Sequence, residues 1–222
     1  TVEDKLVQSG LVSILQAIYE QDFHADSYGF RPQRSGHDAL RALSQTVESE
    51  PIHYMVEADI KGFFDSVDQE QLMKFIGHRI ADKRILRLIR RYLKAGIQED
   101  GQHKASEMGT PQGGVISPLL ANIYLHYTLD LWFEKRFKNQ CEGYVRLIRY
   151  ADDYVVCFQY EAEARSFMTL MEVRLKQFNL EVAPEKTKRF EFGPFAQSKA
   201  KARGERTATF DFLGFTHYCS RS

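Results

Sequence analysis

The stretch "LIRYADDYVVCF", Leu147–Phe158, decides how the rest of the sequence is interpreted. Its two halves are rich in aromatic and β-branched residues and predict two strands, yet two adjacent carboxylates, Asp152 and Asp153, lie between them. Acidic residues are disfavoured in strands, and like charges in contact repel each other. Some other interaction must offset this placement.

Two interpretations of the acidic pair remain open. Aspartate is favoured in hairpin turns, so the pair could have only a structural role. However, "ADD" contains no glycine to supply the positive φ that a tight hairpin turn prefers. A strained acidic turn between two strands indicates a functional site.

The composition alone excludes few classes of protein. The chain has 222 residues with 43% hydrophobic content, enough for a globular core, and its 30 basic and 30 acidic residues neither favour nor exclude a polyanionic partner. The three cysteines form no C-x-x-C pair, which fits free thiols in a reducing compartment. A zinc site that uses His217 and Cys219 is the alternative, but the sequence offers no second pair of ligands at the required spacing. No apolar run approaches the roughly 20 residues that cross a bilayer. We therefore expect a cytoplasmic protein without a membrane partner.

Helix and strand signals alternate irregularly along the chain. Ser35 with Asp38, and Asp68 with Gln71, predict capped helix starts, and "IHYMVEADI" predicts a strand that ends at Asp59. Further along, the sequence predicts a basic helix over 82–94, a hairpin around "QEDGQ", a helix after the loop "GTPQGGVISP" and another over 162–178. The stretch 193–209 is expected to be a loop, and "TFDFLGFTHY" a single final strand.

Three carboxylates could converge in this arrangement. Asp59 ends one strand, and Asp152 and Asp153 occupy a hairpin turn. Mg²⁺ takes oxygen ligands and usually shares them with substrate phosphates. Two such ions can act together in an in-line phosphoryl transfer. The metals would offset the repulsion between the adjacent aspartates.

Five boxes in the sequence closely resemble reverse transcriptases encoded by bacterial group II introns. They are "SYGFRPQRSGHDAL" at 27–40, "ADIKGFFDSVD" at 58–68, "GTPQGGVISPLLANIYLH" at 109–126, "YADD" at 150–153 and "FLGF" at 212–215. They follow the family order and span nearly the whole chain, whereas "ADD" alone would be a weak signal.

The resemblance implies an α+β fold, a right-hand polymerase palm whose mixed or antiparallel sheet packs on helices, with partial fingers. One reverse transcriptase domain would cover 1–222, with fingers and palm helices at 1–52 and 70–108 and mainly palm at 53–69 and 109–222. The family's N-terminal basic fingers hairpin and its helical thumb are not found in this sequence. We therefore expect a fragment that alone polymerises weakly or not at all.

The resemblance also assigns roles to individual residues. Asp59, Asp152 and Asp153 would be the catalytic, metal-binding carboxylates, with the backbone carbonyl of Ile60 as a further ligand. Phe64 matches the family's steric gate, where a bulky ring crowds a ribonucleotide 2′-hydroxyl; a core phenylalanine is the alternative, and one ring of the Phe63–Phe64 pair is expected to face the core. Other nucleotide-pocket residues would be Gln112, Gly113 and Lys186, although a helix-entry loop and a solvated lysine are alternatives.

Basic residues supply candidate nucleic-acid contacts. Arg31 and Arg34 could contact template phosphate, or pair with Asp26 or Asp38. The basic helix carries Lys83, Arg87, Arg90 and Arg91 on a face that could track RNA, lie on a membrane surface, or be only solvated. The resemblance favours RNA.

The resemblance implies an RNA-directed DNA polymerase that uses two Mg²⁺ ions, or Mn²⁺ as a substitute. Its partners would be an RNA template, intron RNA, a DNA primer and deoxynucleotides. The alternative is a non-catalytic, maturase-like RNA-binding splicing cofactor; a nucleotide cyclase on a similar palm lacks its paired-glycine acidic hairpin here. The sequence leaves open which RNA is bound, whether an endonuclease domain follows, the oligomeric state, and whether the parent protein is mobile or domesticated.

Overall fold

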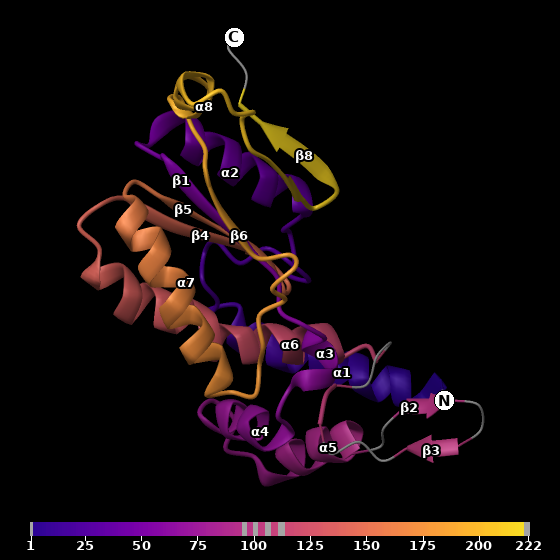
Figure 1. The fold of residues 1–222 in the computed structure, drawn as a ribbon. Coiled ribbons are helices and arrows are strands. Elements are labelled where there is room, and N and C mark those ends of the chain that lie inside the picture. The colour runs from indigo at the N-terminus through magenta and orange to yellow at the C-terminus, as the bar shows by residue number, and fades with distance from the viewer. Residues whose placement is uncertain (1, 95–96, 100–101, 105–107, 111–113, 220–222) are drawn as a thin grey trace.

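A four-stranded antiparallel sheet lies at the centre of the chain (Figure 1). The computed structural model describes residues 2–94, 97–99, 102–104, 108–110 and 114–219. The strand order is β4-β5-β1-β6, with bounds Val145–Tyr150, Asp153–Phe158, Tyr54–Ala58 and Lys188–Glu191. Strand β1 is therefore flanked on both sides, by β5 and by β6.

One face of the sheet packs on the larger apolar cluster. Val56 and Ala58 of β1 and Tyr154 and Val156 of β5 alternate onto this face, as the period of two requires. The helices that complete this cluster are α1 (Val2–Tyr19), α6 (Ser117–Leu125) and α7 (Glu161–Lys176).

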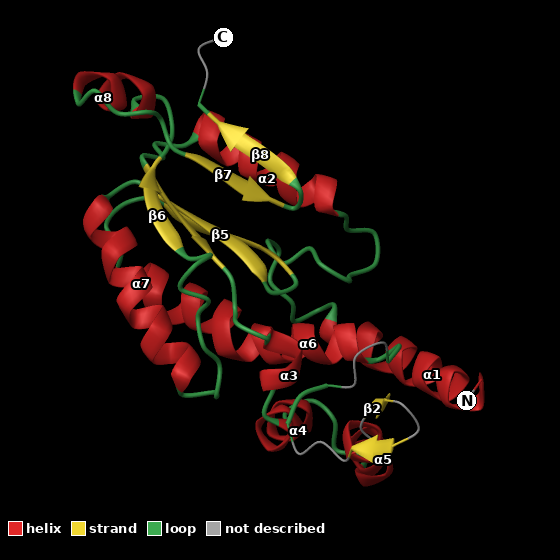
Figure 2. Ribbon diagram, turned by 45° about the vertical axis from the view of Figure 1, so that its right-hand side comes forward, coloured by secondary structure: helices red, strands yellow, loops and turns green. Residues whose placement is uncertain are grey.

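The other face carries a smaller apolar cluster. Met55, Val155 and Cys157 point to this side and pack with helix α2 (Gly36–Ser49) and with strand β7 (Thr209–Phe212), which pairs with β8 (Phe215–Tyr218). Figure 2 shows α7 on one side of the sheet and α2 with β7 and β8 on the other. The side chains of β1 that precede the predicted site therefore alternate between two covered faces.

Short helices lie beyond the end of β1. The chain continues through α3 (Phe63–Ser66), α4 (Gln69–Gly77), α5 (Lys83–Lys94) and the paired strands β2 (Ile97–Glu99) and β3 (Gln102–Lys104). In Figure 1, α4 and α5 lie at the end of the molecule away from α2 and α8. The antiparallel pairing of β2 with β3 agrees with the hairpin predicted around "QEDGQ", whose residues 100 and 101 lie outside the described residues.

The helix that follows residue 117 changes its winding. After α6 it continues as the π-helical segments η1 (His126–Asp130) and η2 (Phe133–Phe137), and then as the 3₁₀ turn η3 (Lys138–Gln140). π-Helical turns are rare and often lie at functional sites.

Both predicted helix starts are confirmed. The Ser35 hydroxyl accepts the Asp38 N–H at 3.3 Å, and the Asp38 carboxylate accepts the Ser35 N–H at 2.9 Å. The Asp68 carboxylate accepts the Gln71 N–H at 2.9 Å. Each bond satisfies a backbone donor that lacks a partner within the helix.

Two expectations near the C-terminal end are wrong. Residues 193–209 do not form a continuous loop, because Ala196–Ala202 form helix α8, whose alanines at 196 and 200 pack inward. The final strand is a hairpin, because Leu213 and Gly214 take φ values of 53° and 79° and reverse the chain between β7 and β8. Positive φ at both central positions is the geometry of a two-residue hairpin turn.

Among the residues that the structure describes, no helix is long and apolar enough to cross a bilayer.

Loss of the α2 cap should lower stability. We expect Ser35→Ala to reduce the free energy of unfolding by about 1 kcal/mol, because the orphan N–H of the first turn loses its acceptor. Ser44→Ala, at an exposed mid-helix site in α2, serves as the control and should change it by less than about 0.5 kcal/mol. Urea unfolding measures both, and equal effects would contradict the capping role.

Candidate functional site

The acidic turn is the tight connection between β4 and β5. Tyr150 pairs with Asp153, which leaves Ala151 and Asp152 as a two-residue loop. Ala151 has a φ of 56°, a left-handed conformation that costs a non-glycine residue roughly 1–2 kcal/mol. The turn therefore holds the strain that the absence of glycine predicts.

The sheet register brings the end of β1 beside this turn. Ala58 is paired with Tyr154, so the next residues along the two strands, Asp59 and Asp153, lie opposite each other. Residues directly opposite in a sheet share a face. Segments separated by about ninety residues are thus joined by the antiparallel pairing of β1 and β5.

A pocket of about 280 Å³ opens at this end of the sheet. Asp59, Asp152 and Lys186 line it together with the α3 residues Phe63 and Phe64. Phe63 is 2% exposed and belongs to the main core, whereas Phe64 is only half-buried and packs edge-on against it with ring centroids 5.4 Å apart. The expectation that one ring faces the core is confirmed for Phe63.

Lysines on the β6 side face the carboxylates of β1. The Lys186 ammonium lies 2.5 Å from Asp59 Oδ2, and the Lys188 ammonium lies 3.1 Å from Glu57 Oε2. The hydrogen bond to Asp59 raises the pKa of Lys186, which stays charged. Lys186 is 65% exposed, so this ion pair is held loosely at the pocket rim.

Burial and neighbouring negative charge both raise the pKa values of the turn carboxyls. Burial, followed by the negative charge of Asp59, raises the pKa of Asp152. Partial desolvation, followed by the charges of Asp152 and Asp59, raises the pKa of Asp153. These shifts arise because the carboxylates lie near each other in a partly dry site, where negative charge is costly.

The donor set suits a hard divalent cation, but it is not a closed cage. Across the described ranges, no three His, Cys, Asp or Glu side chains gather closely enough to hold a metal ion by themselves. The pocket nevertheless offers carboxylate oxygens, and a cation of the protein's own, the Lys186 ammonium, already lies on one of them. Mg²⁺ commonly uses one or two carboxylates and takes its remaining ligands from water and substrate phosphates.

The backbone carbonyl of Ile60 makes no hydrogen bond in the β-bridge between Ile60 and Val182. Ile60 forms an isolated antiparallel bridge with Val182, and its hydrogen bonds run from the Lys61 N–H to Glu181 and from the Ala183 N–H to the Asp59 carbonyl. The groups of Ile60 itself are not used in this bridge. Ile60 lines the pocket, and its carbonyl has no role in the bridge.

A loop from the "GTPQGG" box is tied to α3. The Gly109 N–H donates to the Val67 carbonyl and the Thr110 N–H donates to the Phe64 carbonyl, each at 2.7 Å. The buried Gln69 amide donates to the carbonyls of Gly109 and Leu93, a connection that the sequence reasoning missed. Gln112 and Gly113 lie outside the described residues.

The two arginines of the 27–40 box have mainly structural contacts. The Arg31 side chain is 3% exposed and donates to the Glu20 carboxylate and to the carbonyls of His24 and Ser27. It pairs with neither Asp26 nor Asp38 and does not face solvent, so the expectation of a phosphate contact is wrong for Arg31. Arg34 donates to the Ala25 carbonyl and lies over the Tyr28 ring.

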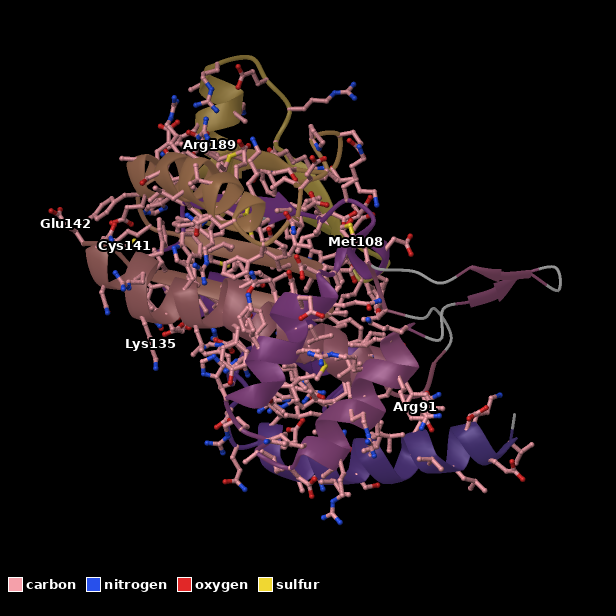
Figure 3. The ribbon with its side chains drawn as sticks, turned by 90° about the horizontal axis from the view of Figure 1, so that it is seen from below. Arg91, Met108, Lys135, Cys141, Glu142 and Arg189 are labelled. Atoms are coloured by element: carbon pink, nitrogen blue, oxygen red, sulfur yellow. The ribbon has the colours of Figure 1, made fainter. Side chains whose placement is uncertain are left out.

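The basic residues of α5 form a separate surface. Lys83, Arg87, Arg90 and Arg91 are all exposed, and Arg90 lies 3.7 Å from Glu70. Figure 3 shows Arg91 far from Arg189 of strand β6. Figure 1 shows α5 apart from strands β4 and β5, which carry the acidic turn.

The chain matches the family described as reverse transcriptase (RNA-dependent DNA polymerase) over residues 1–217. The chain belongs to the reverse transcriptase family.

Relatives of this reverse transcriptase domain include intron proteins. The group II intron-encoded protein LtrA of Lactococcus lactis subsp. cremoris is 48% identical over 126 residues, which cover 57% of the chain and 21% of LtrA. Protein YkfC of Escherichia coli (strain K12) is 39% identical over 140 residues, or 61% of the chain and 36% of YkfC. The resemblance to group II intron reverse transcriptases is confirmed, and the chain spans about a fifth of the length of LtrA.

Solved telomerases share the fold of this reverse transcriptase domain. The telomerase of Candida albicans in complex with a fragment of telomeric RNA superposes with a TM-score of 0.69 at 16% identity, over 95% of the chain and 36% of that protein. Apo telomerase from Candida tropicalis, truncated from the C-terminal domain, gives 0.68 at 16% identity, over 97% and 44%. The predicted α+β polymerase fold is confirmed.

Neutralising one turn carboxylate should stabilise the metal-free protein. A carboxyl with a raised pKa keeps its proton to a higher pH in the folded chain than in the unfolded one, so the folded state loses stability as pH rises from the ordinary aspartate pKa of 3.8 to the raised pKa. We expect Asp152→Asn to raise Tm by about 2–4 °C at pH 7.5 in EDTA and to flatten its pH dependence.

The matched control is Glu185→Gln, an exposed carboxylate at the rim of the same pocket, which should leave Tm unchanged. Thermal unfolding from about pH 3 to 8, a range that begins below the ordinary aspartate pKa, measures both variants. A lower Tm for Asp152→Asn would contradict the repulsion described above.

Proposed function

We propose that the chain is the core of an RNA-directed DNA polymerase from a group II intron protein. It would add deoxynucleotides to a primer: the 3′-hydroxyl oxygen attacks the α-phosphorus, and pyrophosphate leaves. The observation that carries the proposal is that Asp59, Asp152, Phe64 and Lys186 line one pocket within a domain of the reverse transcriptase family.

The carboxylates are the proposed catalytic and metal-binding residues. Asp59, Asp152 and Asp153, with the Ile60 carbonyl, would hold two Mg²⁺ ions, or Mn²⁺ in their place. When bound, these ions supply electrostatic stabilisation of the charge on the reacting phosphate oxygens. The raised pKa values of Asp152 and Asp153 support this role, because a cation would offset the burial and the neighbouring negative charge that raise them.

Lys186 is proposed to act on the leaving group. Its ammonium now pairs with Asp59, but the exposed side chain is free to reorient. When Asp59 is engaged with a divalent cation, Lys186 would move to the negative charge of the departing pyrophosphate.

Phe64 is the proposed selector of deoxynucleotides, and Gln112 and Gly113 are the other proposed nucleotide contacts. The half-buried Phe64 ring lies against Phe63, and the Phe64 carbonyl is bonded to Thr110, so the ring has limited room to withdraw. A 2′-hydroxyl directed at this ring would be excluded sterically.

Template RNA and intron RNA are the proposed partners of the basic surface on α5, formed by Lys83, Arg87, Arg90 and Arg91. Lys83, Arg87 and Arg90 border a hollow of about 380 Å³ between α4 and α5, which supports contact with phosphate. We assign residues 1–52 and 70–108 to fingers and palm helices, and 53–69 and 109–222 mainly to the palm.

Primer extension on an RNA template with Mg²⁺ and deoxynucleotides tests the function. The chain is compared with a longer protein that adds flanking fingers and thumb sequence, and with Asp152→Asn in that longer protein. We expect extension by the longer protein and a loss of about 1,000-fold in Asp152→Asn, equivalent to about 4 kcal/mol of transition-state stabilisation. Glu185→Gln is the control and should extend normally.

Two results would change the assignment. Extension retained by Asp152→Asn would contradict the catalytic role of the turn. Absence of extension in every form, with RNA binding intact, would favour the maturase-like alternative; the Arabidopsis thaliana relative named nuclear intron maturase 2, 26% identical over 177 residues, makes that outcome worth testing.

Shortening the gate residue should relax sugar selection. We expect Phe64→Ala to raise ribonucleotide incorporation relative to deoxynucleotide incorporation by roughly 10- to 100-fold, because the ring no longer meets the 2′-hydroxyl. Single-nucleotide insertion kinetics measure the ratio. Phe167→Leu, in the core on helix α7 and outside the pocket lining, should lower Tm without changing the ratio, and an unchanged ratio in Phe64→Ala would rule out the gate role.

A further inference from the structure

A buried polar network lies directly behind the acidic turn. The Arg149 side chain is completely buried and donates from Nε and a terminal nitrogen to both oxygens of Asp130, at 2.8 and 2.5 Å. Its other terminal nitrogen donates to the Ala151 carbonyl at 2.8 Å and to Asn122 Oδ1 at 3.1 Å. The same guanidinium therefore holds the peptide that joins Ala151 to Asp152.

The backbone of Gly29 supports the turn from another side. The Asn122 amide donates to the Gly29 carbonyl at 2.6 Å, which links this segment to the Arg149 network. A Cβ atom placed on Gly29 would lie 2.3 Å from the Ala151 backbone nitrogen. No side chain fits there, so the turn rests directly on the Gly29 backbone.

Strand β4 itself anchors this segment. The Arg149 N–H donates to the Asp26 carbonyl at 2.9 Å, and the Tyr28 N–H donates to the Arg149 carbonyl at 2.8 Å. These bonds add residues 26–28 to the edge of β4 as a short parallel bridge. Arg149 thus fixes the turn through its side chain and the supporting segment through its backbone.

The π-helical turn delivers the partners of Arg149. Residues eight apart in a regular α-helix point about 80° apart around its axis. The wider π turn over His126–Asp130 reduces this offset, so Asn122 and Asp130 both reach the same guanidinium. The π-helical winding therefore places both side-chain partners of Arg149 behind the acidic turn.

We propose that Arg149 is a positioning residue that, with Asp130, Asn122 and the Gly29 backbone, fixes the strained Ala151–Asp152 turn and so orients the turn carboxylates. The inference rests on the proposed function. A complete buried ion pair contributes little net stability by itself, whereas removal of one of its two partners strongly lowers the free energy of unfolding. The hydrogen bond from Arg149 to the Ala151 carbonyl connects the Arg149–Asp130 ion pair to the acidic turn.

Arg149→Lys compared with Arg146→Lys tests the proposal. Both arginines lie on β4 and both bind an aspartate through two nitrogens, but Arg146 pairs with Asp26 and Thr46 and does not contact the turn. Lysine keeps the charge and loses the planar fork in both variants. Amide hydrogen exchange of residues 150–154 is measured relative to the core of β5 at 155–158, so that global destabilisation cancels.

We expect Arg149→Lys to increase turn exchange relative to the β5 core at least tenfold, and Arg146→Lys to leave the ratio within about twofold. In the extending protein, Arg149→Lys should lower kcat at least tenfold with little change in the KM for primer and template. Equal exchange ratios in the two variants, or normal kcat in Arg149→Lys, would overturn the proposal.

A second pair of variants tests the proposal if Arg149→Lys does not fold. Gly29→Ala places its Cβ against the turn, whereas the Cβ of Gly77→Ala, in helix α4, meets no atom within 4 Å. Exchange of the turn should increase in Gly29→Ala only, and equal behaviour would contradict the proposed support. If the unmodified protein does not extend primers, the proposed function fails, and the exchange ratios still decide whether Arg149 fixes the turn.

Discussion

Electrostatic repulsion among Asp59, Asp152 and Asp153 is the constraint on which the surrounding structure depends. The β1–β5 register brings Asp59 beside the other two, and burial together with the negative charge of Asp59 raises the pKa values of both turn carboxyls. Opposing contributions come from Lys186 at the pocket rim and from the buried bonds that hold the turn in place. Active sites commonly retain such unfavourable charge because the bound state uses it.

The same end of the sheet joins several parts of the molecule. The turn rests on Gly29, and α3 with Phe64 is tied to the loop at Gly109 and Thr110 through backbone bonds. These connections link segments that are distant in the sequence. We therefore expect a substitution in one segment to alter the geometry of the pocket. The basic face of α5 is separate, which is consistent with binding and chemistry on different surfaces.

The local features of the sequence allowed much of this to be predicted. The two capped helices, the strand ending near Asp59 and the acidic hairpin follow from propensity and turn chemistry alone. Convergence of Asp59 with the turn required pairing between distant strands, which local patterns cannot specify, and the family resemblance supplied it. Helix α8 was missed because its alanine and lysine content was interpreted as a loop, and the Leu213–Gly214 turn because one glycine lay within an otherwise strand-like run.

The contacts of individual polar residues were the least predictable. Arg31 lies in the 27–40 box and Arg149 directly precedes the "YADD" box, and nothing in their spacing indicates that each is buried against a distant carboxylate, Glu20 or Asp130. Such pairings depend on the tertiary packing of helices, here including a π-helical turn, which has no clear sequence signal. Exposed candidates such as Lys83 were easier to place, because an amphipathic pattern predicts the exposed face of a helix.

The central claim is that the three carboxylates act together on divalent metal. Electron paramagnetic resonance of free Mn²⁺ in the presence of primer, RNA template and a non-reactive deoxynucleotide analogue measures this directly. The account predicts that the unmodified protein binds Mn²⁺ and that Asp59→Asn and Asp152→Asn each weaken binding at least tenfold, while Glu185→Gln does not. Equal Mn²⁺ affinity in all four proteins would contradict it.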